Sequence, residues 1–296
     1  MDFSQCPQIS SYCKKIVDNG NSSGKVDVVF LANNYTEDEL DAFATDVNNF
    51  IDKEAAHHGL FSVEPFKSYQ DKFNFYFIEK VYNFDFENST YTGLVTKVVR
   101  KECPDMDELV VVLNYQLSGG RIIGFANPHV SVVTRKESLN LREFTYERSF
   151  LHEFGHAFGN LNDEYTKPGQ TSRLDRANCD VAGCPKWCSG RINSSNACYG
   201  LVTKFDDCVD SGNSSESCWD RFGASEQRNI TSCDVGIDCV SGTACVWNCG
   251  GTNGYKPSYV GYWGDVIIPS IMLDGSLDEF DPVSRRHLED LLKNFQ

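Results

Sequence analysis

The sequence predicts an α+β fold in which a layered sheet with covering helices is followed by an irregular half that disulfide bonds hold together. Three observations predict this fold. Strand-like and helix-like patterns alternate up to about residue 159, hydrophobic periodicity disappears after residue 165, and ten of the 13 cysteines lie between Cys179 and Cys249. We therefore expect two parts, residues 1–165 and residues 166–296, the second of which contains a cysteine-rich insert at about 179–249.

The first half begins with a buried strand and a long helix. An apolar run at Lys25–Ala32 predicts the strand, and Thr36 with Glu39 forms a capping box that opens a helix extending to about His57. The alternation then continues along the chain. We expect further strands at Phe73–Val81, Leu109–Asn114 and Val130–Thr134, and further helices at Tyr91–Lys101 and from near Glu143 to about Gly159.

The end of the chain predicts a closing helix at about residues 282–294. Asp281 can cap the N-terminus of this helix, and apolar residues such as Val283 and Leu288 follow it at helical spacing. Pro282 suits the first helical position, because its missing N–H would have no helical partner there.

The composition excludes several classes of partner. Lys and Arg total 27 against 42 Asp and Glu, so the net charge of −15 repels the phosphates of nucleic acids and anionic membrane surfaces. We therefore expect no nucleic-acid partner. No apolar run reaches the roughly 18 to 20 residues of a membrane-spanning helix, so we expect no transmembrane segment in this chain.

The cysteines of the insert predict disulfide bonds formed in an oxidising compartment. Disulfides are favoured over a zinc cluster, because paired C-x2-C spacings are missing and no histidine lies between Cys179 and Cys249. The spacing does not reveal the pairing, and the odd number of cysteines leaves at least one unpaired or bridged to another chain. We expect a secreted or cell-surface protein, although the first residues of this chain carry no recognisable export signal.

A cluster of carboxylates in the insert offers a second metal site. Asp206, Asp207 and Asp210 lie close together in the sequence, and carboxylate oxygens are ligands that Ca²⁺ prefers. A solvated acidic loop is the more common role of such a cluster, and both interpretations stay open.

The segment Leu151–Tyr165, LHEFGHAFGNLNDEY, carries the chemistry. On a helix, His152 and His156 project from one face, where both imidazoles can bind one Zn²⁺. Glu153 lies beside them and is placed to act as the general base that takes a proton from a metal-activated water. Two core histidines without a metal would leave the carboxylate between them unexplained, since burying it unpaired is costly.

Two histidines leave a catalytic zinc one protein ligand short. Gly159 can adopt a left-handed conformation that ends the helix and turns the chain back toward the metal. Asp163 is the expected third ligand, because its short side chain follows this turn most closely, and Glu164 is the alternative. A helix cap or a salt bridge is the competing role for both acids, and the neutral amide of Asn162 is a poor ligand.

HEFGH followed by AFGNLNDEY resembles the metzincin clan of zinc peptidases and, within it, the IgA-peptidase-like family, also called igalysins or M64. The likeness extends to the strand Lys25–Leu31, to the segment Glu64–Tyr69, and to Val111–Asn114 with the Gly119–Gly120 turn. Pro269–Met272 is similar to the Met-turn of metzincins. The cysteine-rich insert has no counterpart in the bacterial IgA peptidase.

The resemblance implies a zincin-like fold with a cleft between two subdomains. The upper subdomain would hold a mixed β-sheet, a backing helix and the active-site helix, and the lower one the irregular disulfide-rich segment, the Met-turn at about 269–274 and the C-terminal helix. Met272 would pack beneath the zinc ligands without binding the metal. Gly119, Gly120 and His129 would lie on the rim, where an edge strand can pair with an extended peptide.

Stabilisation of the transition-state oxyanion has several candidates. Zinc acts as the main Lewis acid in this chemistry, and a tyrosine or a backbone donor can assist it. Tyr165, Tyr259 and Tyr262 are the candidate tyrosines, and the sequence does not select one of them.

These observations predict an exported zinc endopeptidase with a protein or peptide substrate. His152, His156 and Asp163 would hold the zinc, and Glu153 would be the general base. The alternative is a non-catalytic exported adhesion or binding module that retains a structural zinc site, although such a site has no chemical need for Glu153. A gluzincin-type peptidase, with Glu164 or a more distant glutamate as ligand, is disfavoured by Gly159 and by the Met-turn.

Overall fold

The computed structural model describes residues 10–54, 58–86, 92–115, 124–127, 129–135, 146–163, 176–178, 208, 211–213, 217, 262–263, 266–267, 270–272 and 279–295. The chain forms two compact units, which are described separately. The first comprises Met1–Gly159 with Leu288–Gln296, and the second comprises Asn160–His287.

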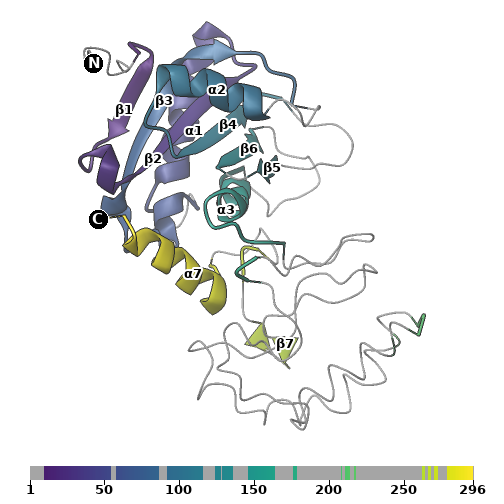
Figure 1. Ribbon diagram of the computed structural model, residues 1–296. Coiled ribbons are helices and arrows are strands. Elements are labelled where there is room, and N and C mark those ends of the chain that lie inside the picture. The colour runs from purple at the N-terminus through teal and green to yellow at the C-terminus, as the bar shows by residue number, and fades with distance from the viewer. Residues whose placement is uncertain are drawn as a thin grey trace, which may run out of the picture. The chain divides into compact units, whose positions relative to one another are not determined.

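The first unit is built on a six-stranded mixed sheet with the strand order β1-β3-β2-β4-β6-β5 (Figure 1). The four inner strands are mutually parallel, and the two edge strands, β1 and β5, run antiparallel to their neighbours. The bounds are Cys13–Val17 for β1, Val26–Asn33 for β2, Phe73–Tyr82 for β3, Glu108–Leu113 for β4, Gly124–Asn127 for β5 and Val130–Thr134 for β6. The expected α+β class with a mixed sheet is confirmed.

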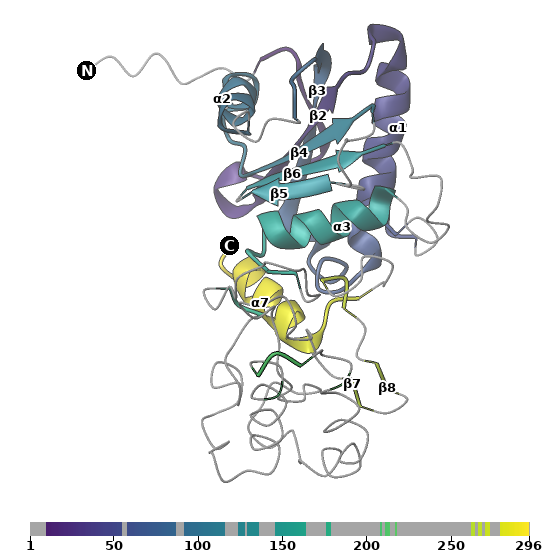
Figure 2. The same ribbon diagram turned by 90° about the vertical axis from the view of Figure 1, so that its right-hand side faces the viewer.

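Helices cover both faces of this sheet. Figure 2 shows α1 and α2 on opposite sides of the strands. The bounds are Leu40–Ile51 for α1, Thr92–Glu102 for α2 and Tyr146–Ala157 for α3, with short 3₁₀ turns at Ser22–Gly24, Glu37–Glu39, Leu60–Ser62 and Gln70–Lys72. Coverage on both faces explains why β2 and β4 are buried along their whole length and read as continuous apolar runs.

The expected helix from Thr36 begins with the capping box, but it ends at Ile51, well before His57. Asp52 adopts an extended backbone with ψ 150°, and its Oδ1 accepts a hydrogen bond from the N–H of Glu54 at 2.9 Å. A short carboxylate side chain that bonds the backbone two residues ahead competes with helix continuation. The other expected strands and helices begin and end within about three residues of the observed ones.

The strands β1 and β5 were not expected from the sequence. Both are short edge strands. The three middle residues of β1 are exposed and two of them are lysines, so β1 carries no buried apolar run that predicts a strand. The four residues GFAN of β5 are too short a run to predict one. A disulfide between Cys13 in β1 and Cys103 at the end of α2 fastens the first edge to the helix layer. Disulfide bonding is therefore present in this chain, here outside the cysteine-rich insert.

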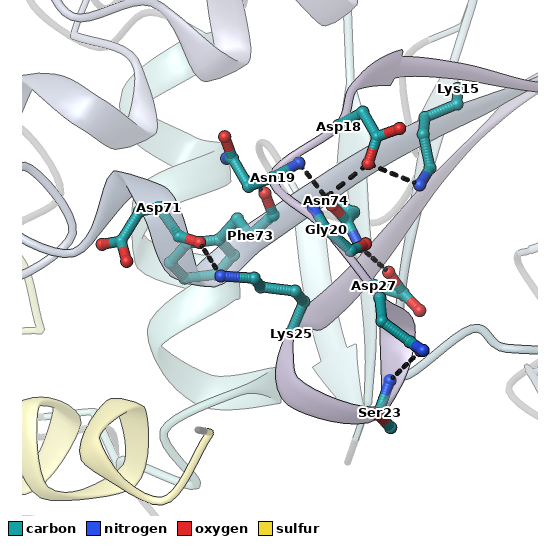
Figure 3. A network of polar contacts seen from close by, with 11 residues as sticks. Lys15, Asp18, Asn19, Gly20, Ser23, Lys25, Asp27, Asp71, Phe73 and Asn74 are labelled. Carbon is teal, nitrogen blue, oxygen red and sulfur yellow. Dashed lines mark hydrogen bonds and ion pairs between the residues drawn. The ribbon is translucent and has the colours of Figure 1, made fainter.

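A buried asparagine fastens the loop between β1 and β2 to β3 (Figure 3). Asn74 Oδ1 accepts a hydrogen bond from the N–H of Asn19 at 2.8 Å, and its Nδ2 donates to the carbonyl of Gly20 at 3.1 Å and to Asp27 Oδ1 at 2.8 Å. Lys25 Nζ donates to the carbonyl of Asp71 nearby at 2.6 Å. The carboxamide thus satisfies backbone groups that no strand pairs.

Phenylalanines fill the layer between the sheet and the helices α1 and α3. Phe30 of β2 lies 6.0 Å from Phe50 of α1 and 6.1 Å from Phe150 of α3, between ring centroids. Phe50 and Phe150 are 4.9 Å apart, and Phe154 of α3 lies 5.6 Å from Phe66. All five rings are completely buried, so α3 is held to the sheet by aromatic packing.

The described parts of the second unit include a two-stranded ribbon, a turn at residues 270–272 and the start of the last helix. The ribbon pairs β7 (Tyr262–Trp263) with β8 (Val266–Ile267) in antiparallel fashion. The last helix, α7, runs from Pro282 to Lys293. Asp281 Oδ1 accepts the N–H of Val283 at 2.9 Å and of Ser284 at 3.2 Å, so the expected N-cap is confirmed.

Two further expectations concern disulfide bonds in the insert and transmembrane segments, and each can be compared with the described residues. Cys208 of the insert is disulfide-bonded. Among the helices that the structure describes, none combines the length and the apolar character that crossing a membrane requires.

The substitution Phe154→Ala tests the aromatic packing of α3. We expect it to lower the free energy of unfolding by about 3–5 kcal/mol, because it removes a completely buried ring and leaves a cavity. Leu94→Ala is the control, since Leu94 is 49% exposed and its loss should cost no more than about 0.5 kcal/mol. Urea unfolding without reductant measures the free energy of unfolding of both variants. Equal losses in the two variants would contradict the role of Phe154 in the packing of α3.

Candidate metal centre

The helix α3 has two faces with different tasks. Phe150 and Phe154 are four residues apart on the face that packs against the sheet and α1. His152 and His156 are offset from them by two positions, which is about 200° around an α-helix. Burial of the phenylalanine stripe therefore directs the two imidazoles together to the opposite side.

The two imidazoles converge on one position. His152 Nε2 and His156 Nε2 lie 3.1 Å apart, and the ring planes are nearly perpendicular, at 89°. Two nitrogens that each lie at about 2.0–2.1 Å from a tetrahedral ion would be about 3.3 Å apart. The separation in the structure is close to this value, so the pair fits a shared cation.

Asp163 joins the pair. The ligating atoms of His152, His156 and Asp163 all lie within 4.8 Å of one another, and the three side chains are buried or partly buried. The described residues thus bring together two imidazole nitrogens and one carboxylate oxygen from a segment of continuous chain. Glu164, the alternative third ligand, lies outside the described residues.

The chain reaches Asp163 through a left-handed residue just after the helix. The N–H groups of Phe158 and Gly159 still bond back to the carbonyls of Phe154 and Gly155, at 2.9 and 3.1 Å. The positive φ, 49°, falls on Asn160, one residue later than the expected Gly159. Asparagine tolerates this conformation better than most residues, so the helix persists one residue longer before the chain turns.

A second segment supports this turn. Asn178 Oδ1 accepts the N–H of Asn162 at 2.9 Å, and Asn178 Nδ2 donates to the carbonyl of Asn162 at 2.9 Å. Sequence reasoning missed Asn178, because it lies in a stretch without periodicity, beside the first cysteine of the insert. Asn162, which occupies the position of the third ligand in the common metzincin spacing, donates its Nδ2 to the carbonyl of Asp163 at 3.1 Å.

Glu153 follows His152 directly on α3 and is 9% exposed. One helical step places it about 100° around the axis from His152, between the histidine face and the sheet-facing stripe. A buried carboxylate costs free energy unless contacts or chemistry retain it. Its expected role as the general base stays a prediction.

His129 links the sheet to the end of α3. Its N–H donates to the carbonyl of Ala157 at 3.3 Å, and its Nδ1 lies 2.7 Å from Oε1 of Glu108, at the start of β4. Glu108 is only 3% exposed, and this burial raises the pKa of its carboxyl group. The hydrogen bond to Glu108 raises the pKa of His129. The expectation that His129 lies on a substrate rim stays a prediction.

Several other predicted residues have no described surroundings. Gly119, Gly120, Tyr165 and Tyr259 lie outside the described residues, as do the acidic residues Asp206, Asp207 and Asp210, and Tyr262 is described only as the first backbone position of β7. Met272 is completely buried, and its N–H donates to Ser270 Oγ at 3.2 Å. Its expected place beneath the zinc ligands stays a prediction.

Residues 15–85 match the IgA Peptidase M64 family. This range contains the strand Lys25–Leu31 and the segment Glu64–Tyr69, so the resemblance expected for these two segments is confirmed. The matched range ends before α3. The resemblance of α3 to zinc peptidases therefore rests on the HEFGH segment at residues 152–156. A comparison with curated proteins finds no match.

The hydrogen bond between His129 and Glu108 predicts that the stability of the fold depends on pH. The pKa of His129 is raised above its ordinary 6.5 mainly by the hydrogen bond to Glu108, while Asp107 adds to the rise and Arg100 opposes it. A raised pKa in the folded state means that protonation of His129 contributes to the stability of the fold fully below pH 6.5, and that this contribution is lost as the pH rises through the raised value. We expect Glu108→Gln to lower the pKa of His129.

An NMR titration of the His129 ring in wild type and Glu108→Gln measures this change. Glu79→Gln is the control, because Glu79 is an exposed carboxylate on β3 that pairs with Lys14. A His129 pKa that is the same in Glu108→Gln and wild type would contradict the pairing.

Proposed function

We propose that this chain is a secreted zinc metalloendopeptidase. The observation that carries the proposal is that the ligating atoms of His152 and His156 on α3 lie close to that of Asp163, which follows the helix. Glu153 directly follows the first of these histidines on α3. The match of residues 15–85 to a family of peptidases supports the same class of reaction.

The donor set fits zinc. Two imidazole nitrogens and one carboxylate oxygen, with a further position left to water or substrate, are typical of catalytic zinc sites. His152, His156 and Asp163 would hold the ion. Bound zinc supplies Lewis acidity, which polarises a carbonyl group and makes water a stronger acid.

Glu153 would move the proton. Its carboxylate accepts a proton from the water whose oxygen adds to the scissile carbonyl carbon. The same group then delivers this proton to the amide nitrogen as the C–N bond breaks, so that the products are a carboxylic acid and an amine. Transfer of the second proton of the water from the acid to the amine gives the carboxylate and the ammonium ion. Glu153 is buried on α3, which limits the access of bulk water to its side chain.

The substrate would be a protein or peptide, in which a peptide bond is cleaved. The enzyme would act outside the cell. The disulfide between Cys13 and Cys103 and the disulfide-bonded Cys208 support an oxidising compartment, since such bonds are rare where thiols are kept reduced. The acidic net charge of −15 further disfavours nucleic acid as a partner.

The substitution Glu153→Gln tests the proposal. We expect cleavage of denatured casein to fall at least about 100-fold, because an amide of the same shape cannot accept the proton. Zinc content, measured by mass spectrometry, should stay at the wild-type level, because Glu153 is not a ligand. Glu79→Gln, at an exposed position of β3, should leave both quantities unchanged.

Two outcomes would count against the proposed function. If Glu153→Gln cleaved casein at the wild-type rate, Glu153 would not be the base. If the wild-type chain held zinc but cleaved neither casein nor a library of quenched peptides, the non-catalytic binding module would replace the enzyme.

A further inference from the structure

Asn178 holds the chain next to the proposed third ligand. Its side chain is completely buried, and it reaches a backbone position 16 residues earlier in the sequence. The carboxamide oxygen accepts the N–H of Asn162 and the carboxamide nitrogen donates to the carbonyl of the same residue, both at 2.9 Å. We call this pair of bonds the Asn178 clamp.

The clamp determines the orientation of the peptide that leads into Asp163. The N–H and the C=O of one residue belong to two successive peptide planes, and the C=O of Asn162 shares its plane with the nitrogen of Asp163. A planar carboxamide presents donor and acceptor side by side, so one side chain orients both planes. If the clamp is lost, the N–H and the C=O of Asn162 lose these two partners, and the two peptide planes are no longer held in one orientation.

Neighbouring contacts restrain the same stretch of chain. Arg176 Nη1 donates to the carbonyl of Asn160 at 3.4 Å, and Asn160 is the left-handed residue of the turn. Asn162 Nδ2 donates to the carbonyl of Asp163 at 3.1 Å. The residues 176–178 therefore lie along residues 160–162 and restrain them at more than one point.

We propose that Asn178 is a positioning residue of the metal centre, which acts on the zinc through the backbone of Asp163. This inference rests on the proposed function, because it takes Asp163 as a zinc ligand. Asn178 does not touch the ion. It holds the carboxylate of Asp163 close to the two histidines. Asp163 therefore loses less conformational entropy when the metal binds.

Asn33 provides a matched control in the first unit. It is completely buried at the end of β2, its Oδ1 accepts the N–H of Phe84 at 2.7 Å, and its Nδ2 donates to the carbonyl of Phe84 at 3.1 Å. The chemistry and burial are those of the Asn178 clamp, but the clamped residue is far from Asp163 in the sequence. Asn33→Ala therefore removes the same interactions without releasing a proposed ligand.

The test measures zinc affinity of the full chain by competition with a chelator of known affinity. We expect Asn178→Ala to weaken zinc binding about 10–100-fold, the usual effect of losing a residue that orients a ligand. Asn178→Asp, which keeps the shape and the acceptor but not the donor to the Asn162 carbonyl, should also weaken it. Asn33→Ala should destabilise the fold and leave the zinc affinity within about twofold of wild type.

A double-mutant cycle separates positioning from general stability. If Asn178 acts through Asp163, Asn178→Ala should have no further effect on zinc affinity once Asp163→Ala is present. Wild-type affinity in Asn178→Ala and Asn178→Asp, or fully additive losses in the double variant, would overturn the positioning role and leave the proposed function standing. A wild-type chain that binds no zinc would overturn both.

Discussion

The packing of α3 against the sheet is the interaction on which the metal centre depends. Phe150 and Phe154 are completely buried among the rings of Phe30, Phe50 and Phe66. This packing sets the rotation of the helix about its own axis, and the rotation decides where His152 and His156 point. A helix that turned by one residue would move the phenylalanines out of the aromatic core and redirect both imidazoles, so the core and the ligand pair specify the same orientation.

A histidine pair on a rigid helix can be preorganised by packing alone, but a third ligand beyond the helix end cannot. The described residues directly after α3, 158–163, belong to no strand or helix, and polar contacts orient them. The backbone N–H of His129 donates to the carbonyl of Ala157, and the side chain of Asn178 bonds both backbone groups of Asn162. The aromatic core and these hydrogen bonds thus position different ligands of one proposed site.

The parts of the fold that could be predicted from sequence are those with strong local patterns. The apolar runs of β2 and β4, the Thr36–Glu39 capping box and the Asp281 cap each leave a signature in neighbouring residues. The HExxH spacing likewise predicts a histidine pair, because both residues lie on one helix. The clamp by Asn178, the bond from Glu108 to His129 and the Cys13–Cys103 disulfide join residues far apart in the chain, and no local pattern reveals them.

The most direct test of the proposed metal centre is X-ray absorption spectroscopy at the zinc edge on the full chain loaded with one equivalent of zinc. The ligand set of His152, His156 and Asp163 predicts a first shell of nitrogen and oxygen only, at about 2.0–2.1 Å, with the scattering pattern of two imidazoles. Sulfur at about 2.3 Å would contradict it, because the cysteines rather than His152, His156 and Asp163 would then hold the metal.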